Sequence, residues 1–104
     1  MTELRPIHLA SLDKVRPVLV LTRHLVIPHL SRVTVAPITS RIRGLSVEVG
    51  VGRHNGLDQD CVVNCDNVQT IEKGLLLRSV GFLLAAQEQA LRDALMAAFD
   101  LVNT

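Results

Sequence analysis

The sequence has 104 residues, of which 48% are hydrophobic and 20% are charged. A chain of this length and composition is expected to form one globular domain over residues 1–104, which excludes a multidomain protein and an intrinsically disordered one. The formal net charge of +1 excludes a protein that binds long nucleic acids by overall charge alone, so any anion site must be local.

The first part of the chain predicts two strands and a loop. "RPIHLA" (residues 5–10) is a strand candidate, and the polar "SLDK" after it is a tight connection. "RPVLVLT" (residues 16–22) is a continuous apolar run with β-branched residues, which indicates a buried strand. We interpret "RHLVIPHLS" (residues 23–31) as a loop, because Pro28 breaks helices.

The middle of the chain predicts two more strands. One is "RVTVAPIT" (residues 32–39), in which Pro37 indicates a bulge or an unpaired position. The other is "SVEVGV" (residues 46–51), which alternates at period two. Asn55-Gly56 predicts a hairpin turn after it.

Two strand candidates precede the C-terminal segment. "CVVNCDNVQTI" (residues 61–71) predicts a long strand with a kink at Asp66-Asn67. Gly74 predicts a turn, and "LLLRSVGFLL" (residues 75–84) predicts a further strand.

From Ala86 the apolar period becomes that of a helix, whose stripe consists of Leu91, Leu95, Ala98 and Phe99. No Ser, Thr or Asp caps its start. Five or six strands followed by one helix predict a mainly β fold, a small barrel or curled sheet with the helix packed on it. The chain lacks Trp and Tyr, and a small aliphatic core favours an obligate oligomer.

Cys61 and Cys65 are the only cysteines. Four residues apart on one predicted strand, they would share a face about 13 Å apart, which is too far for a disulfide. We therefore expect reduced thiols in a reducing compartment. The histidines are too scattered for a metal site. The sequence has neither a membrane-spanning run nor a signal peptide, so a soluble cytoplasmic protein is predicted.

A polar cluster follows the strand at residues 32–39. Thr39 and Ser40 stand at its carboxyl end, with Arg41 and Arg43 just beyond, and Arg16 opens the apolar strand at residues 16–22. A guanidinium matches phosphate oxygens two at a time, and a hydroxyl can rotate to donate. This pattern indicates a site for a phosphate or for a phosphorane transition state, in which negative charge accumulates.

Ordinary structural roles explain the same residues. The arginines would be solvated ends of strands, while Thr39 and Ser40 would form turns by bonding nearby backbone. Asp66 would be a turn residue, and His54 a surface residue. From the residues alone, the chain is a small β-rich domain with a candidate anion site.

The chain resembles one known family in four ordered blocks: "RPVLVLT", "VTVAPITSRIRG", "VEVGV…NGLDQDCVVNCDNVQTIEKGLL" and "VGFLLAAQEQALRDALMAAFDL". They are similar to the MazF/PemK/Kid toxins, the ribonuclease components of toxin–antitoxin pairs, over nearly the whole chain. The resemblance implies an SH3-like small barrel of the CcdB/Kid/MazF type with a C-terminal helix. It also implies a homodimer and metal-independent, sequence-specific cleavage of single-stranded RNA without a cofactor.

The same resemblance implies roles for individual residues. Arg16 falls on the family's catalytic arginine, Thr39 on the catalytic threonine of "PITS", and Asp66 on a carboxylate that Kid-like members use in catalysis. The implied RNA-binding residues are Ser40, Arg41, Arg43, His54, Asn67 and Gln69.

Two departures from the family bear on these roles. Kid-like members place an arginine two residues before the aspartate, where this chain has Asn64, which favours the pair of Arg16 and Thr39 over a Kid-type mechanism. Family members also carry a longer loop between the first two strands, which is reduced here to "SLDK". That loop often shapes the RNA groove, so the groove and the cleavage sequence are not carried over.

The implied mechanism resembles that of ribonuclease A. The 2′-OH attacks the adjacent phosphate and expels the 5′-oxygen, which requires RNA and no metal. Arg16 would stabilise charge, since a guanidinium hardly deprotonates. The general base is left open among Asp66, His54 and a water.

The implied partners are single-stranded RNA and a cognate antitoxin, MazE-like or other, whose disordered acidic tail covers the arginines; no membrane is involved. Two functions from other classes stay open. One is a CcdB-like toxin that acts by binding gyrase, and the other is an inactive module that only binds its antitoxin.

Overall fold

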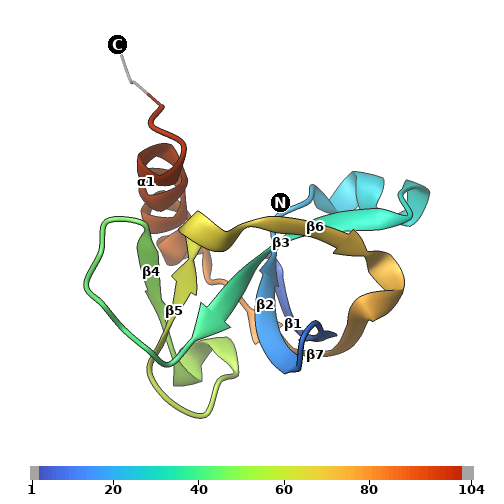
Figure 1. Ribbon diagram of the computed structural model, residues 1–104, viewed down its shortest axis with the longest axis horizontal. Helices are drawn as coiled ribbons and strands as arrows, with labels where there is room; N and C mark the ends of the chain where they lie inside the picture. Colours follow the sequence, from blue (N-terminus) through green and yellow to red (C-terminus); the bar gives the residue numbers. More distant parts are fainter. Residues whose placement is uncertain (1–2, 102–104) are drawn as a thin grey trace.

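The computed structural model describes residues 3–101, so the predicted domain limits at residues 1 and 104 lie outside the described part. Within that part the chain is mainly β with one C-terminal α-helix, as predicted (Figure 1). The elements are β1 (Pro6–Ser11), β2 (Val15–Val20), η1 (His24–His29), β3 (Arg32–Thr39), β4 (Glu48–Val51), η2 (Arg53–Asn55), β5 (Cys61–Asn64), η3 (Cys65–Asn67), β6 (Gln69–Glu72), η4 (Lys73–Leu75), β7 (Leu76–Phe82), η5 (Ala85–Gln87) and α1 (Glu88–Ala98).

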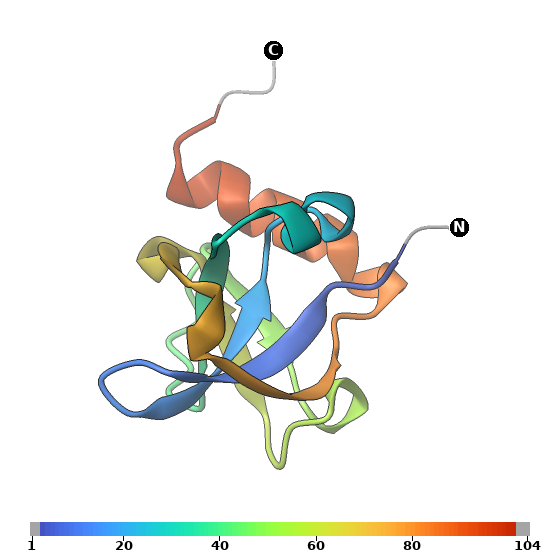
Figure 2. The same cartoon turned by 90° about the vertical axis from the view of Figure 1, so that its right-hand side faces the viewer.

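The strands form one curled antiparallel sheet in the order β4-β5-β3-β2-β1-β7, and β6 also pairs with β3. Strand β3 is therefore the hub, since different parts of it pair with β2, β5 and β6. The ribbon from β6 through η4 to β7 bends round one side and nearly closes a barrel (Figure 1). Helix α1 lies along one side of the curled sheet (Figure 2) and contacts β4 and η3.

Two hydrophobic clusters lie on opposite faces of β1, β2 and β3. Leu19 belongs to the cluster that packs under α1, whereas its neighbours Val18 and Val20 belong to the second cluster, with Ile71 of β6. This explains the unbroken apolar run of β2, because a strand that is covered on both faces has no polar side. The prediction of a buried strand there is confirmed.

The number of strands within residues 3–101 is seven, where five or six were predicted. The expected kink at Asp66-Asn67 is real, but it is a full turn, η3, which divides the predicted strand into β5 and β6. Cys65 therefore lies in η3 and not on one strand with Cys61, so that prediction was wrong. Both thiols are free and buried.

Two connections differ in detail from their predictions. Residues 23–31 contain the 3₁₀ helix η1 rather than an irregular loop, because a short helix of this kind tolerates Pro28 near its end. Asn55-Gly56 does lie in the hairpin between β4 and β5, but the loop also holds η2 and is longer than two residues. Gly56 has φ +87°, which suits glycine.

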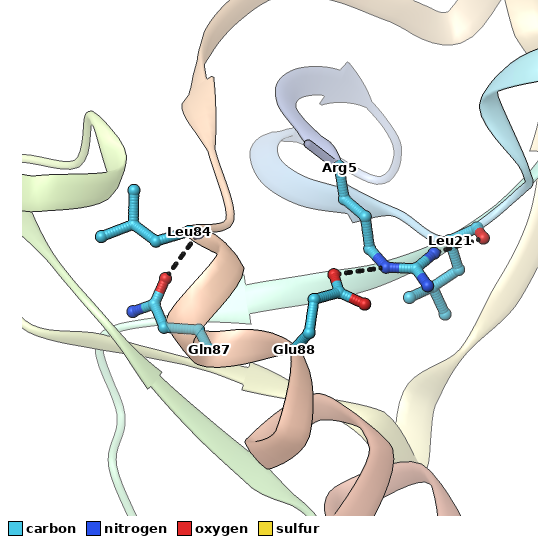
Figure 3. Close-up of polar contacts among 5 residues, drawn as sticks. All are labelled: Arg5, Leu21, Leu84, Gln87 and Glu88. Carbon is cyan, nitrogen blue, oxygen red and sulfur yellow. Dashed lines mark hydrogen bonds and ion pairs between the residues drawn. The ribbon is translucent and has the colours of Figure 1, made fainter. Parts of the chain in front are cut away.

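The start of α1 is fixed without a side-chain cap at Gln87, as the sequence indicates. Figure 3 shows Gln87 accepting a hydrogen bond from the Leu84 amide at 2.9 Å through Oε1. Arg5 donates through Nε to Glu88 at 2.8 Å and through Nη1 to the Leu21 carbonyl at 3.0 Å. The N-terminal segment, the end of β2 and the helix are thereby joined.

Most of the predicted helix stripe packs as expected. Leu91 is buried, and Leu95 and Ala98 pack against the core. Phe99 was assigned wrongly, because it follows the end of the helix and its exposed fraction is 57%. Ala94 is buried in its place. None of the helices in the described part is long and apolar enough to cross a membrane.

Candidate functional site

A cavity of about 730 Å³ opens where the start of β2, the end of β3 and the β5–β6 connection meet. Seven of the residues singled out from the sequence line it: Arg16, Thr39, Arg41, Arg43, Asp66, Asn67 and Gln69. Segments far apart in the sequence are thus gathered at one place by the central position of β3.

The pairing of β2 with β3 explains why Arg16 and Thr39 share this cavity. Val18 lies opposite Pro37 in the antiparallel register. The pairing ends there, two residues short of Arg16 and Thr39, and both of these residues line the cavity. Arg16 lies near the start of β2 and Thr39 at the end of β3, so both side chains are presented from strands and not from loops.

Thr39 is half-buried at the end of β3. Its Oγ1 accepts a hydrogen bond from the Arg41 amide at 3.1 Å, the turn-forming contact considered as its ordinary structural role. The bond uses one lone pair and leaves the hydroxyl proton free to donate to a ligand oxygen. The structural role and a role toward a ligand are therefore compatible.

Arg16 is held by Asp13, a residue that the sequence argument did not single out. Arg16 Nε and Nη2 donate to Asp13 Oδ1 and Oδ2, each at 3.2 Å. This hydrogen-bonded pair lowers the pKa of Asp13 and raises the pKa of Arg16. The acid–arginine spacing of three residues in "SLDKVR" is the signal that could have revealed it.

Arg41 and Arg43 belong to the connection between β3 and β4, which Glu48 folds onto itself. The Glu48 carboxylate accepts hydrogen bonds from the backbone amides of Arg43, at 3.2 Å, and Leu45, at 3.1 Å. The Glu48 carboxylate thus accepts hydrogen bonds from backbone amides of its own connection. Within residues 3–101, neither the Arg41 nor the Arg43 guanidinium forms an ion pair.

Asp66 and Asn67 are placed by Asn64, the residue that departs from the Kid-like pattern. Asn64 is the N-cap of η3, and its Oδ1 accepts a hydrogen bond from the Asp66 amide at 2.9 Å. This capping contact gives Asn64 a local structural role. It fixes the turn from which Asp66 and Asn67, both exposed, reach the cavity.

Two predicted RNA-binding residues do not join this cluster. Ser40 is exposed but does not line the cavity. His54 lies in η2, which packs against β7, and it is also absent from the lining. His54 therefore lies outside the group of residues that contains Arg16 and Thr39, and its assignment as a candidate general base stays a prediction.

The charges in the cavity are balanced, which the sequence did not predict. Three arginines (Arg16, Arg41 and Arg43) face three carboxylates (Asp13, Glu48 and Asp66). Only Arg16 is paired with a cavity carboxylate through its side chain. An anion entering the cavity would meet Arg41 and Arg43 side chains that form no competing ion pair with any residue of the described part, 3–101.

Known proteins resemble this chain along nearly its full length. Residues 1–99 match the family described as PemK-like, MazF-like toxin of type II toxin–antitoxin system. Endoribonuclease MazF3 from Mycobacterium tuberculosis is 60% identical over 98 residues, which cover 94% of this chain and 95% of that protein.

Solved structures agree with this match. The Mycobacterium tuberculosis toxin MazF-mt6 has a TM-score of 0.93 at 60% identity, covering 95% of this chain and 100% of that chain. A mycobacterial endoribonuclease in complex with its cognate antitoxin has a TM-score of 0.85 at 24% identity, covering 99% and 100%, so that likeness shows the fold alone. The predicted fold class is confirmed, and the chain belongs to the PemK-like, MazF-like toxin family of type II toxin–antitoxin systems.

Proposed function

We propose that this chain is an endoribonuclease toxin that cleaves single-stranded RNA in the cavity between β2, β3 and the β5–β6 connection. The observation that carries the proposal is that Arg16 and Thr39, from two different strands, line one cavity. Arg41 and Arg43 line it too and form no ion pair within residues 3–101. A protein 60% identical to this chain is named an endoribonuclease, which supports the same activity.

The reaction needs an arrangement that these residues offer. The ribose 2′-oxygen forms a bond to the adjacent phosphorus, and the bond from phosphorus to the 5′-oxygen breaks. The 2′ proton passes to Asp66 or to a water, and the 5′-oxygen takes up a proton. Arg16 and Thr39 donate hydrogen bonds to the phosphorane oxygens, where negative charge accumulates. The products are a 2′,3′-cyclic phosphate and a 5′-hydroxyl.

Arg41, Arg43, Asn67 and Gln69 line the approach to that centre. The two guanidiniums suit backbone phosphates, and the two amides suit base edges. Ser40 and His54 have no such position and are left out of this proposal.

The two alternative functions are less well supported. A toxin that binds gyrase does not need Arg16 and Thr39 in one cavity, and the 60% identical relative is an endoribonuclease by name. An inactive antitoxin-binding module is disfavoured because the arginine and the threonine are both present and both reach the cavity.

Incubation of the purified chain with a long single-stranded RNA in excess EDTA tests the activity. We expect discrete cuts that leave 5′-hydroxyl and 2′,3′-cyclic phosphate ends, and no cleavage of DNA of the same sequence. Cleavage that appears only with added metal would contradict the proposed mechanism, and intact RNA under all conditions would contradict the proposed activity.

We also propose a cytoplasmic homodimer that is neutralised by an antitoxin with a disordered acidic tail. Arg41 and Arg43, which lack ion-pair partners among the described residues, would contact that tail. Affinity for such a peptide should fall between low and high salt, because exposed charges are screened. Equal affinity at both salt concentrations would remove the electrostatic part of this proposal.

A further inference from the structure

The connection between β3 and β4 carries two of the three arginines that line the cavity. It runs over residues 40–47, which form neither a helix nor a strand. Arg41 and Arg43 are exposed on it, whereas Arg16 lies on β2. An arginine on an irregular segment binds a phosphate well only if that segment is held in place, because the cost of ordering it is otherwise subtracted from the binding free energy.

The side chain of Glu48, the first residue of β4, holds this connection. Its Oε1 accepts hydrogen bonds from the Arg43 amide at 3.2 Å and from the Leu45 amide at 3.1 Å, and Oε2 lies 3.3 Å from the Arg43 amide. Gly44, between these two residues, has φ +72°, a left-handed conformation that suits glycine. The carboxylate therefore fixes the backbone on both sides of Gly44.

Glu48 is anchored in turn by the sheet. It lies opposite Asn64 of β5 in the antiparallel register, and both residues line the cavity. Nearer the other end of the connection, the Arg41 amide donates to Thr39 Oγ1 at 3.1 Å. The backbone that carries the two arginines is thus tied at Arg41 to the end of β3 and at Arg43 to the start of β4.

The charge of Glu48 does not account for its presence in this cavity. Glu48 lines the cavity together with three arginines, yet it forms no ion pair within residues 3–101. A negative charge beside a phosphate site repels the phosphate, so by charge alone the residue would weaken RNA binding. The contacts with the backbone amides have the opposite effect, and substitutions can separate the two.

We infer that Glu48 is a positioning residue for RNA binding: its carboxylate folds the β3–β4 connection so that the guanidiniums of Arg41 and Arg43 meet phosphates of the RNA backbone. This inference rests on the proposed function. Glu48 itself binds no RNA and transfers no proton. Without it, the two arginines keep their charge but lose their fixed position, so RNA binds more weakly and with fewer phosphate contacts.

Three substitutions separate the reach of the side chain from its charge. Glu48→Asp keeps the charge but shortens the side chain by one methylene, so it should lose the hydrogen bond from at least one amide. Glu48→Gln removes the charge but keeps an oxygen at the position of Oε1, which can accept from both amides. Glu48→Ala removes both the reach and the charge.

The Kd is measured at several salt concentrations on an RNA oligonucleotide that spans a mapped cut site and has a 2′-deoxy residue at the cut. Glu48→Asp and Glu48→Ala should each raise the Kd roughly fivefold to twentyfold, since charge-assisted contacts are weakened. The slope of log Kd against log salt should fall by up to about 1.4, or about 0.7 for each lost phosphate contact. Glu48→Gln should bind as tightly as the wild type or more tightly.

Further variants test whether the effect passes through the two arginines. Glu72→Ala removes a carboxylate from an exposed residue outside the cavity and should leave the Kd within about twofold. Glu48→Ala added to the double variant Arg41→Ala, Arg43→Ala should cause no further loss of affinity, because the residues through which it acts are gone.

Trypsin, which cuts after arginine, reports on the connection without RNA. It should cleave the connection faster in Glu48→Ala and Glu48→Asp than in the wild type or Glu48→Gln, because a loosened segment is more often open to the protease. Circular dichroism checks that each variant is folded. Glu48→Asp is the smaller change and keeps the test decisive if Glu48→Ala does not fold.

The contrary outcomes are distinct. An unchanged Kd in folded Glu48→Asp and Glu48→Ala, or equal trypsin cleavage of all variants, would show that the carboxylate does not order the connection. Tighter binding by Glu48→Ala would show that its charge outweighs its contacts. A further loss in the double arginine variant would show that Glu48 acts by another route. Each of these overturns the inference. If the wild-type chain neither binds nor cleaves single-stranded RNA while trypsin still cuts Glu48→Ala faster, it is the proposed function that fails.

Discussion

Two parts of the chain determine the position of Arg16. The pairing of β2 with β3 brings it to the same cavity as Thr39, and the turn before β2 supplies Asp13. An arginine fixed in this way is pre-organised for an oxyanion, so little reorganisation is needed when charge develops. Its contribution should therefore appear in the rate of cleavage.

Arg16→Ala should reduce single-turnover RNA cleavage roughly a hundredfold to a thousandfold, the usual loss when one pre-organised oxyanion donor is removed. Arg16→Lys should also be damaging, because an ammonium cannot bind phosphate and Asp13 with two edges. Thr39→Ala should cost more than Ser40→Ala, since Ser40 does not line the cavity.

Arg78→Ala is the matched control, because Arg78 is exposed on β7 and lies outside the cavity. It should leave the cleavage rate near that of the wild type. Circular dichroism checks that each variant is folded. Near-native rates for both Arg16→Ala and Thr39→Ala would refute the assignment of the site.

Cys65 leads to a prediction about pH. Burial, and then the nearby Asp66 charge, raise the pKa of Cys65 to about 11 from an ordinary value of 9.0. Between these values the unfolded chain loses the thiol proton while the folded chain keeps it, so the free energy of unfolding falls as pH rises from about 9 to about 11.

Urea denaturation across that pH range measures the effect. The decline should be shallower in Cys65→Ala, which removes the thiol but leaves both lysines to titrate. Identical slopes in the wild type and in Cys65→Ala would contradict the prediction. The native thiol should also react slowly with iodoacetamide at pH 8, because the thiolate is the nucleophile.

At the scale of elements, local pattern predicted the strands but not the breaks between them. The run at residues 32–39 was predicted with the same limits as β3, because its alternation and flanking polar residues are local signals. The division of β5 from β6 depends on the Asn64 cap and on β6 pairing with a different part of β3. Such long-range pairing has no signature in residues 61–71 alone.

The same distinction explains which site residues were predicted. Arg16 and Thr39 were candidates for an anion site from the residues alone, and the family resemblance added their catalytic roles. That they line one cavity depends on how β2 and β3 pair in space. Asp13 and Glu48 were missed because each acts through contacts with groups that look ordinary in the sequence. His54 was a candidate RNA-binding residue and general base from the sequence, and η2, which contains it, packs against β7.

The contact of η2 with β7 supports a prediction about glycines. A Cβ on Gly81 would lie 1.9 Å from the Asn55 carbonyl oxygen, so the two backbones touch. Buried Asn55 links the same elements, because its Nδ2 donates to the Phe82 carbonyl and to Gln87 Oε1 at 2.9 and 2.6 Å. This junction leaves no room for a side chain.

Gly81→Ala should therefore lower the free energy of unfolding by about 1–3 kcal/mol or more, as expected of overpacking. Gly74→Ala is the matched control, because a Cβ there meets nothing within 4 Å. Its stability should stay within about 1 kcal/mol of the wild type. Chemical denaturation of both variants measures the difference. Equal stabilities would show that the backbone at Gly81 and Asn55 can move apart at little cost, and would contradict the prediction.

At the scale of the whole molecule, the core is small and aliphatic, and the surface carries many apolar side chains. The exposed fraction is 83% for Leu25, 57% for Phe99 and 59% for Leu101. A single large exposed apolar side chain is ordinary, but several on a chain of 104 residues are a reason to expect a covering partner. A second copy of the chain is the partner that the proposed homodimer supplies.

The proposed homodimer predicts a particle of twice 11.4 kDa by light scattering at micromolar concentration. Its Tm should fall on dilution, because dissociation and unfolding are linked by mass action. The decrease should be absent if the chain folds alone, since the unfolding of a monomer does not depend on concentration. A mass near 11.4 kDa, together with a Tm that is the same at every concentration, would refute the homodimer. Cleavage in the cavity would then have to be complete within one chain, which is possible because Arg16, Thr39 and Asp66 all come from the same protomer.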